Sequence, residues 1–168
     1  MTVAIRPALP REIEAVRDIE RASAQRFLGL MDALAADEPS AAPVLAARIG
    51  TGGLLVARAG EVLAGFVMFR PVEDGLYIEQ VDVLPAFERR RIGAALIDAV
   101  AARARVLGLP RLSLSTFRDV PWNAPYYRRL GFEDIDEAAL TPGLLAIRRE
   151  HLARGLDEEA RVFMERPA

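Results

Sequence analysis

The sequence contains no cysteine and only one histidine. Without cysteine the chain has no disulfides, no thiolate metal ligands and no cysteine nucleophile, and nothing in it requires an oxidising compartment. No stretch approaches the roughly 18 consecutive apolar residues of a membrane-spanning helix, and the N-terminal residues MTVAIRPALPRE lack the apolar run of a signal peptide. A net charge of −2 gives no broad attraction to nucleic acid or to anionic membranes. We therefore expect a soluble cytoplasmic protein whose partners include neither nucleic acid nor a membrane.

Apolar residues make up 52 % of the 168 residues, which is enough for a hydrophobic core and too many for a disordered chain. The sequence has no internal repeat and no stretch with the composition of a linker. We expect a single domain over residues 1–168.

Strand and helix patterns alternate along the chain. Runs rich in β-branched and aromatic residues predict strands at residues 3–6, 54–58, 62–70, 77–83, 111–116, 132–135 and 160–165. Apolar spacing of three and four predicts helices at residues 13–27, 42–49, 92–107 and 141–154, with shorter ones within 29–43 and at 124–130. Tight turns predict an antiparallel meander over 54–83, and the crossover helix predicts that 77–83 and 112–116 pair in parallel.

The segment 77–107 changes from a strand pattern to a helix pattern across a basic turn. Three consecutive arginines, Arg89–Arg91, lie in that turn, and Gly93 lies at the start of the predicted helix. A helix N-terminus with a bare backbone and nearby arginines favours an anion, because unpaired N–H groups and the helix dipole both attract negative charge. A plain strand–helix corner with a solvated basic edge fits the same features, so these residues alone leave both interpretations open.

Two motifs in the chain resemble those of the GCN5-related N-acetyltransferase (GNAT) superfamily. The segment VLPAFERRRIGAAL (83–96) resembles the family's pyrophosphate loop, R/Q-x-x-G-x-G/A ahead of a helix, and NAPYYRRLGF (123–132) resembles N-x-x-A-x-x-F-Y-x-x-x-G-F. The order of predicted elements is similar over nearly the whole chain. The resemblance implies an α+β fold, with a central, twisted, mixed and mostly antiparallel sheet of about six to seven strands flanked by helices. It also implies transfer of an acetyl group from the co-substrate acetyl-CoA to a primary amine, without a metal.

Two alignments of the loop fit the family pattern. The first is Arg90-x-x-Gly93-x-Ala95. The second places Glu88, Arg91 and Gly93 at the positions of R/Q, the first glycine and the second glycine. We prefer the second, because it keeps the first core residue of the helix three positions after the last glycine, and it requires Arg91 to adopt a conformation that glycine takes more freely. The resemblance implies that the coenzyme pyrophosphate contacts the backbone of this loop, at Arg89, Arg90, Arg91, Ile92, Gly93 and Ala94.

The resemblance also implies roles in the chemical step. The backbone of Val81 and Val83 would pair with the pantetheine arm, and an N–H near Val83 would polarise the thioester carbonyl. Tyr127 would protonate the departing thiolate, because the ordinary pKa of a tyrosine, about 10, lies above that of a thiol. Tyr126 is the alternative acid and a further coenzyme contact. A buried Tyr127 that only packs the short helix is the structural alternative.

Glu79 is the candidate base. Alternation along the predicted strand places Glu79, Val81 and Val83 on one face, where a carboxylate can take the proton of an amine directly or through water. Polyamine acetyltransferases resemble this stretch through a Tyr-x-Glu on the same strand. A glutamate that faces solvent at a sheet edge, or that only binds the substrate ammonium, is the alternative.

Two further polar residues have competing interpretations. Asn123 is expected to cap the short helix that follows it, and the family motif offers a coenzyme contact as the alternative. We expect His151 on the surface of a C-terminal helix, too far in sequence to complete a triad with Ser113 or Ser115. Direct attack of the amine in a ternary complex is therefore the simpler mechanism.

The acceptor is selected in this family by two segments, here Arg26–Pro43 and Ala138–Leu156. The acidic residues of the first segment favour a small amine or an amino-acid-like acceptor, with a protein N-terminus or lysine as the alternative. A non-catalytic acyl-CoA-binding domain on the same fold is a further alternative. Homodimers are frequent in the family, and Ala160–Glu165 is the candidate interface strand by analogy.

Overall fold

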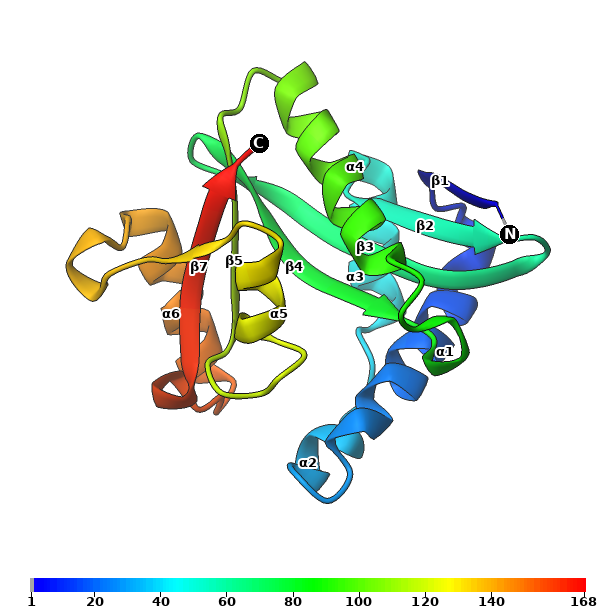
Figure 1. Ribbon diagram of the computed structural model, residues 1–168, viewed down its shortest axis with the longest axis horizontal. Coiled ribbons are helices and arrows are strands. Elements are labelled where there is room, and N and C mark those ends of the chain that lie inside the picture. Colours follow the sequence, from blue (N-terminus) through cyan, green and yellow to red (C-terminus); the bar gives the residue numbers. More distant parts are fainter. Residues whose placement is uncertain (1) are drawn as a thin grey trace. The chain divides into compact units, whose positions relative to one another are not determined.

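The computed structural model describes residues 2–168, and a seven-stranded sheet runs through it (Figure 1). The strand order is β1-β2-β3-β4-β5-β7-β6. Adjacent strands pair antiparallel in β1–β2, β2–β3, β5–β7 and β6–β7, and β4 pairs with β5 in parallel. The sheet is thus mixed and mostly antiparallel, as the sequence predicts. The strand bounds are β1 Val3–Pro7, β2 Leu54–Ala59, β3 Val62–Val72, β4 Gly75–Val83, β5 Arg111–Phe117, β6 Glu133–Asp134 and β7 Arg161–Pro167.

The helices follow the predicted pattern closely. The predicted helix over 13–27 ends as a 3-10 turn at Gln25–Phe27, and Pro142 opens the C-terminal helix directly after the capping residue Thr141. The bounds are α1 Ile13–Ala24, α2 Asp32–Ala35, α3 Ala42–Thr51, α4 Ile92–Val106, α5 Ala124–Arg129 and α6 Pro142–Ala153.

The chain forms two compact units, one of residues 1–69 with 80–99 and one of residues 70–79 with 100–168. Strands β3 and β4 and helix α4 each contribute residues to both units. The single domain expected over 1–168 stays a prediction.

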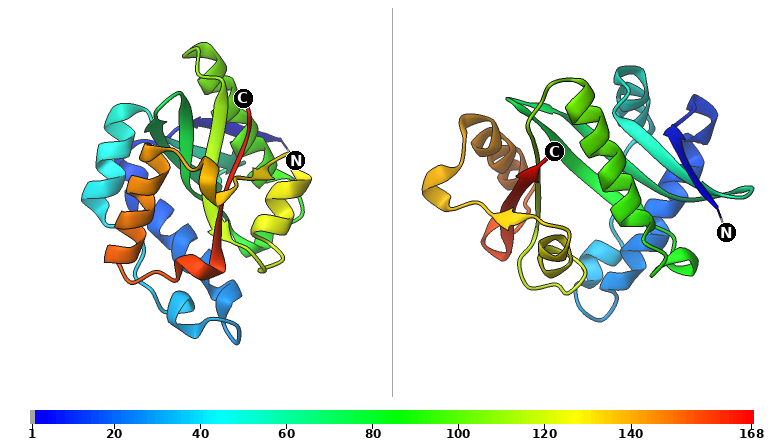
Figure 2. Two further views of the ribbon diagram at one scale, coloured as in Figure 1. Left: turned by 90° about the vertical axis from the view of Figure 1, so that its left-hand side faces the viewer. Right: turned by 45° about the horizontal axis from the view of Figure 1, so that its top comes forward.

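In the first unit, α1 and α3 pack on one face of β2 and β3 (Figure 2). Val16 and Ile19 of α1, Leu45 of α3 and Phe66 of β3 are fully buried in one apolar cluster. Gly65 lies on the other face of β3, where an added Cβ would lie 3.4 Å from Leu96 of α4. The apolar periods of α1 and α4 thus cover opposite faces of the same strands.

In the second unit, α5 and α6 lie on opposite sides of β5 and β7 (Figure 2). Leu144 and Ile147 of α6 pack against Tyr77 of β4 and Phe163 of β7. This cluster fixes α6 over the end of β4 that belongs to the second unit.

Candidate active site

The exposure of β4 changes along its length. Gly75–Ile78 is buried and pairs with Arg111–Leu114 of β5. From Glu79 to Val83 the strand is only partly buried, although β4 lies between β3 and β5 in the sheet. An interior strand is ordinarily covered on its faces. Glu79–Val83 is therefore the accessible part of a central strand, where a ligand can reach both backbone and side chains.

A turn with two left-handed residues joins β4 to α4. Arg89 and Arg91 have φ angles of 61° and 60°, a region in which residues other than glycine are uncommon. The predicted conformation of Arg91 is confirmed, and it fits the alignment in which Arg91 replaces the first glycine of the family loop. Leu96 is fully buried, as that alignment also requires.

The N-terminus of α4 follows this turn directly. The bond from Ala95 N to Arg91 O, at 3.0 Å, starts the regular helical ladder. The amides of Ile92, Gly93 and Ala94 precede it, and such amides together with the helix dipole favour an anion. The exposed arginines before them add positive charge. The turn can thus hold a phosphate with its backbone.

Tyr127 lies in α5 and is 8 % exposed. Its ring makes edge-to-face contacts with Tyr126 and Phe132, at centroid distances of 5.4 and 5.8 Å. Tyr126 is less buried, and the guanidinium of Arg129 lies 5.7 Å from its ring centroid. The two tyrosines therefore have different surroundings, which makes them a matched pair for substitution.

Asn123 occupies the N-cap position of α5, but its side chain makes no capping hydrogen bond, so the predicted side-chain cap is wrong. An N-cap side chain accepts from the second or third amide of the helix, and Pro125 at the second position has no N–H to donate. The Oδ1 atom of Asn123 is buried, and within residues 2–168 it has no hydrogen-bond partner. A buried amide oxygen left in this state costs free energy unless a donor reaches it.

Glu79 lies beside two charged residues of its own unit. The Oε2 atom of Glu79 is 3.5 Å from Arg70 Nε, and Arg70 Nη2 is 3.6 Å from Glu150 Oε2 of α6. The Glu79 side chain is 17 % exposed. Arg70 also lies 5.9 Å from the ring centroid of Tyr77. The carboxylate of Glu79 is thus held near α6, one of the two segments expected to select the acceptor.

Asp82 is a polar residue of β4 to which the sequence analysis gave no role. Its Oδ1 accepts a hydrogen bond from Ser23 Oγ of α1 at 3.0 Å, and its Oδ2 accepts one from Gln80 Nε2 at 2.7 Å. Burial raises the pKa of Asp82 to about 6, and the two hydrogen bonds only partly oppose this. The sequence feature that could have identified Asp82 is its place as an acidic residue between two valines of a predicted strand.

The expected surface position of His151 is wrong. His151 is 9 % exposed, and its Nδ1 lies 2.6 Å from Glu158 Oε1. The reason is its place on α6, because Leu144, Ile147 and His151 follow the helical spacing and share the buried face. Burial lowers the pKa of His151, and Glu158 opposes that shift. The histidine belongs to the core of the second unit.

The predicted site residues fall into two groups by unit. The first unit carries Val81, Val83 and the turn Arg89–Ala94, and the second carries Glu79, Asn123, Tyr126 and Tyr127. Among residues 2–168, no three His, Asp or Glu side chains gather in a way that could hold a metal ion. No helix in the described chain is long and apolar enough to cross a membrane.

Solved structures with the same fold include several acetyltransferases. The PaiA N-acetyltransferase of Thermoplasma acidophilum, in complex with coenzyme A, matches with a TM-score of 0.74 and 16 % identity over 100 % of both chains. The N-acetylglutamate synthase of Neisseria gonorrhoeae, complexed with coenzyme A and N-acetyl-glutamate, matches with a TM-score of 0.76 and 18 % identity. The match covers 99 % of this chain and 35 % of that one. The ribosomal-protein-S18-alanine N-acetyltransferase of Escherichia coli matches with a TM-score of 0.67 and 16 % identity, over 99 % of this chain and 94 % of that one. At these identities the likeness establishes the fold.

The family itself follows from the sequence profile. The profile of the acetyltransferase (GNAT) family matches residues 14–132, which include the accessible half of β4, the left-handed turn and the whole of α5. With this match added to the fold and the geometry of the turn, the chain belongs to the GNAT family of acetyltransferases.

Proposed function

We propose that this chain transfers an acetyl group from acetyl-CoA to a primary amine, by direct attack in a ternary complex. One observation carries the proposal: the accessible residues Glu79–Val83 of a central strand lead directly into the left-handed turn and the N-terminus of α4. A strand backbone can pair with the amides of an extended arm, and a helix N-terminus can hold a diphosphate. Coenzyme A contains both groups.

The loop residues Arg89–Ala94 hold the pyrophosphate in this proposal, mainly through their amides. Val81 and Val83 pair with the pantetheine arm through their backbone, and an N–H near Val83 polarises the thioester carbonyl. Asn123 contributes its buried Oδ1, which accepts from a coenzyme amide or hydroxyl donor. This gives Asn123 a coenzyme contact in place of the helix cap.

Tyr127 and Glu79 take the two proton transfers. Glu79 binds the ammonium of the acceptor and takes its proton, directly or through water, so that the amine can attack the carbonyl carbon. The C–S bond breaks as the amide forms, and Tyr127 gives its phenolic proton to the departing sulfur. The burial of Tyr127 supports a fixed orientation for that transfer.

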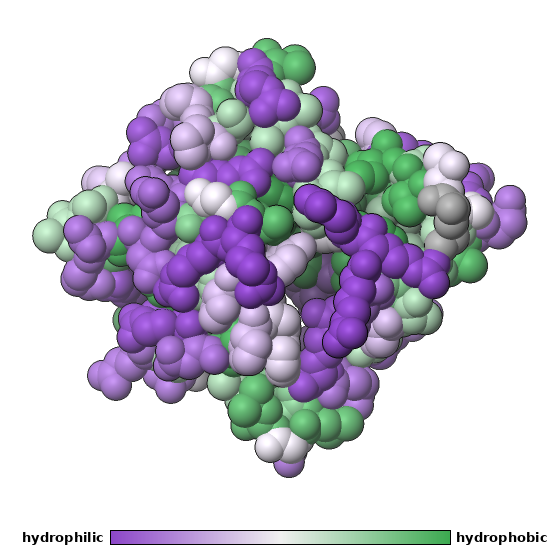
Figure 3. Space-filling view, in the orientation of Figure 1, coloured by the Kyte–Doolittle hydropathy of each residue, from purple (hydrophilic) through white to green (hydrophobic). Residues whose placement is uncertain are grey.

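The acceptor is a small amine or an amino-acid-like molecule in this proposal. Two of the three acidic residues in the first selecting segment accept hydrogen bonds within its own turns: Asp32 accepts from Gly29 N at 2.6 Å, and Asp37 accepts from Glu38 N at 3.1 Å. The loop before α2 instead exposes Leu28 and Leu30, at 60 % and 54 %, and apolar residues gather at that end of the molecule (Figure 3). An acceptor with an apolar group fits this loop better than a polycation.

A thiol-release assay with acetyl-CoA and a panel of amines, amino acids and peptides tests the proposal. We expect turnover with at least one small primary amine. Tight binding of coenzyme A without turnover on any acceptor would favour the non-catalytic acyl-CoA-binding domain instead. Turnover confined to peptides would favour a protein substrate. The 22 basic residues of the chain are all arginine, so an acetyl-lysine signal in that experiment cannot come from the enzyme.

The homodimer also stays a prediction, which light scattering on the purified chain tests.

A further inference from the structure

Glu88 places a negative charge in the turn that would receive the coenzyme diphosphate. The family pattern has a polar or basic residue at the position that Glu88 takes in the preferred alignment. In the structure the Oε1 atom of Glu88 lies 2.8 Å from Nε of Arg26, which belongs to the 3-10 turn after α1. Within residues 2–168 this Nε has no partner with hydrogen-bond geometry, so the contact is an ion pair defined by distance. The acidic residue is therefore neutralised by an arginine from a distant part of the sequence.

The same arginine contacts the backbone of β4. Leu84 N donates to Ala64 O of β3 at 2.8 Å. In a trans peptide the carbonyl points opposite to the following N–H, so the Val83 carbonyl points away from β3. Arg26 Nη2 donates to this carbonyl at 3.1 Å. The guanidinium thus lies at the edge of β4 opposite β3, beside the backbone to which the pantetheine arm is assigned.

The end of α1 is anchored to β4 one turn before Arg26. Ser23 of α1 donates to Asp82, and Ser23 and Arg26 are three residues apart, on one side of the helix. Two consecutive contacts therefore fix this end of α1 against residues 82–88. The Arg26 side chain is held in place by its surroundings as well as by its charge partner.

We propose that Arg26 is a positioning residue for the coenzyme: it neutralises Glu88 and fixes the Val83 peptide. This inference rests on the proposed function. Without Arg26, the Glu88 carboxylate is left uncompensated in the turn proposed to bind the diphosphate, and the two negative groups repel each other. Replacing Glu88 by a neutral isostere removes the repulsion, so the effect of losing Arg26 depends on the identity of residue 88.

Calorimetric titration of coenzyme A tests this in four forms of the protein: wild type, Arg26→Ala, Glu88→Gln and the double variant. We expect Arg26→Ala to weaken binding about tenfold and the double variant to recover most of the loss, with Glu88→Gln measured as the remaining corner of the cycle. In turnover assays the KM for acetyl-CoA should rise in Arg26→Ala, with a smaller change in kcat. Arg21→Ala is the matched control, because Arg21 also carries an ion pair on α1, with Asp18 at 2.8 Å.

The outcomes separate the inference from the proposed function. Unchanged binding in Arg26→Ala, or a double variant no better than Arg26→Ala, overturns the role of Arg26 while wild-type binding upholds the coenzyme site. Failure of the wild type to bind coenzyme A overturns both. If Arg26→Ala unfolds, Arg26→Gln tests the loss of the charge alone, because its amide can still donate to the Val83 carbonyl.

Discussion

At the scale of single residues, we expect the backbone conformation of the turn after β4 to matter more for coenzyme binding than the charge of its arginines. Arg89 and Arg91 adopt left-handed φ angles, which cost a non-glycine residue about 1 kcal/mol or more. The turn keeps this geometry without glycine at either position, because the neighbouring strand and helix over-determine it. The amides proposed to bind the coenzyme phosphates depend on that geometry.

Substitutions at Arg91 separate the two contributions. Arg91→Gly keeps the left-handed geometry and loses the charge, so we expect the affinity for coenzyme A to stay within about threefold of wild type. Arg91→Val places a β-branched residue at φ 60°, and we expect at least a tenfold loss. Calorimetric titration measures both. Equal losses in the two variants would show that the charge, and not the backbone, holds the ligand.

The proton donor is also a question at the residue scale. We expect Tyr127→Phe to lower kcat about 100-fold, because the thiolate then leaves without a positioned acid. Tyr126→Phe, the adjacent and less buried tyrosine, should stay within about threefold of wild type. Steady-state turnover with saturating acetyl-CoA measures both. Equal rates in the two variants would remove Tyr127 from the mechanism.

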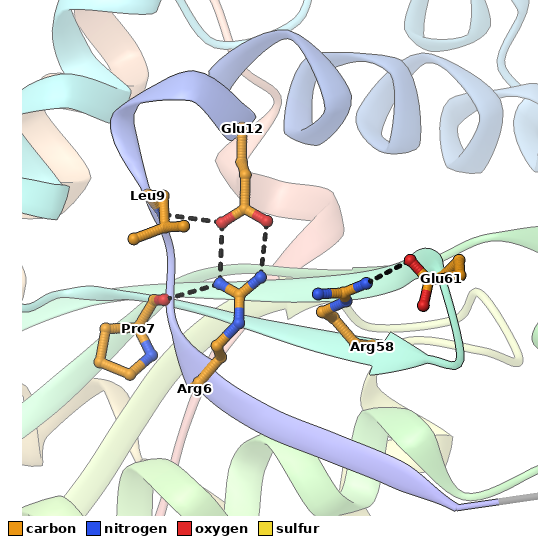
Figure 4. A network of polar contacts seen from close by, with 6 residues as sticks. All are labelled: Arg6, Pro7, Leu9, Glu12, Arg58 and Glu61. Carbon is orange, nitrogen blue, oxygen red and sulfur yellow. Dashed lines mark hydrogen bonds and ion pairs between the residues drawn. The ribbon is translucent and has the colours of Figure 1, made fainter.

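At the scale of secondary structure elements, one ion pair fixes the entry into α1. Arg6 of β1 makes two hydrogen bonds of 2.8 Å to the carboxylate of Glu12, which also accepts from Leu9 N at 2.8 Å (Figure 4). These bonds lower the pKa of Glu12 to about 2. The folded state therefore favours the ionised carboxylate, and β1 is joined to the start of α1, the helix that carries Ser23 and precedes Arg26.

The stability that this carboxylate provides depends on pH with a defined sign. Because the folded pKa lies below the ordinary value, the contribution is complete above about pH 4.5 and is lost as the pH falls toward 2. We expect Glu12→Gln to destabilise the chain by about 2 kcal/mol at pH 7, and the difference from wild type to shrink between pH 4.5 and 2. Urea unfolding across this range measures it.

Glu61 provides the control for this experiment. It pairs with Arg58 at 3.4 Å in the same region, but its side chain is 99 % exposed (Figure 4). Exposed pairs contribute little, so Glu61→Gln should leave the stability unchanged at every pH. A Glu12→Gln variant whose deficit does not vary with pH would contradict the assignment.

At the scale of the whole molecule, the sheet and the order of elements were predictable, while the contacts that shape the site were not. Hydrophobic period and turn residues are local, so they located the strands and the parallel pair β4–β5. The bond between Ser23 and Asp82 spans 59 residues, and that between Arg26 and Val83 spans 57. Such contacts depend on how helices dock, and no local pattern reports them. The burial of His151, in contrast, follows the helical spacing that it shares with Leu144 and Ile147.

The unfolding of the whole chain is also predictable. Strands β3 and β4 and helix α4 each contribute residues to both compact units. Unfolding of either unit therefore disrupts strands and a helix that the other unit also uses. We expect one calorimetric transition, whose midpoint rises by about 5–10 °C at a coenzyme A concentration 100 times its Kd. Adenosine alone is the control. Two separate transitions would contradict the single domain, and an unshifted midpoint would contradict coenzyme binding.

The proposed role of Arg26 has a consequence for the affinities of the two substrates. Leu28 and Leu30 lie two and four residues after it, in the loop to which the proposed function assigns the acceptor, while its guanidinium contacts Val83 and Glu88. On the proposed role of Arg26, a molecule that orders this loop changes the free energy with which the turn binds the coenzyme. Thermodynamic reciprocity then requires the coenzyme to change the affinity for that molecule by the same factor. On this proposal, one side chain would make the binding of two substrates cooperative.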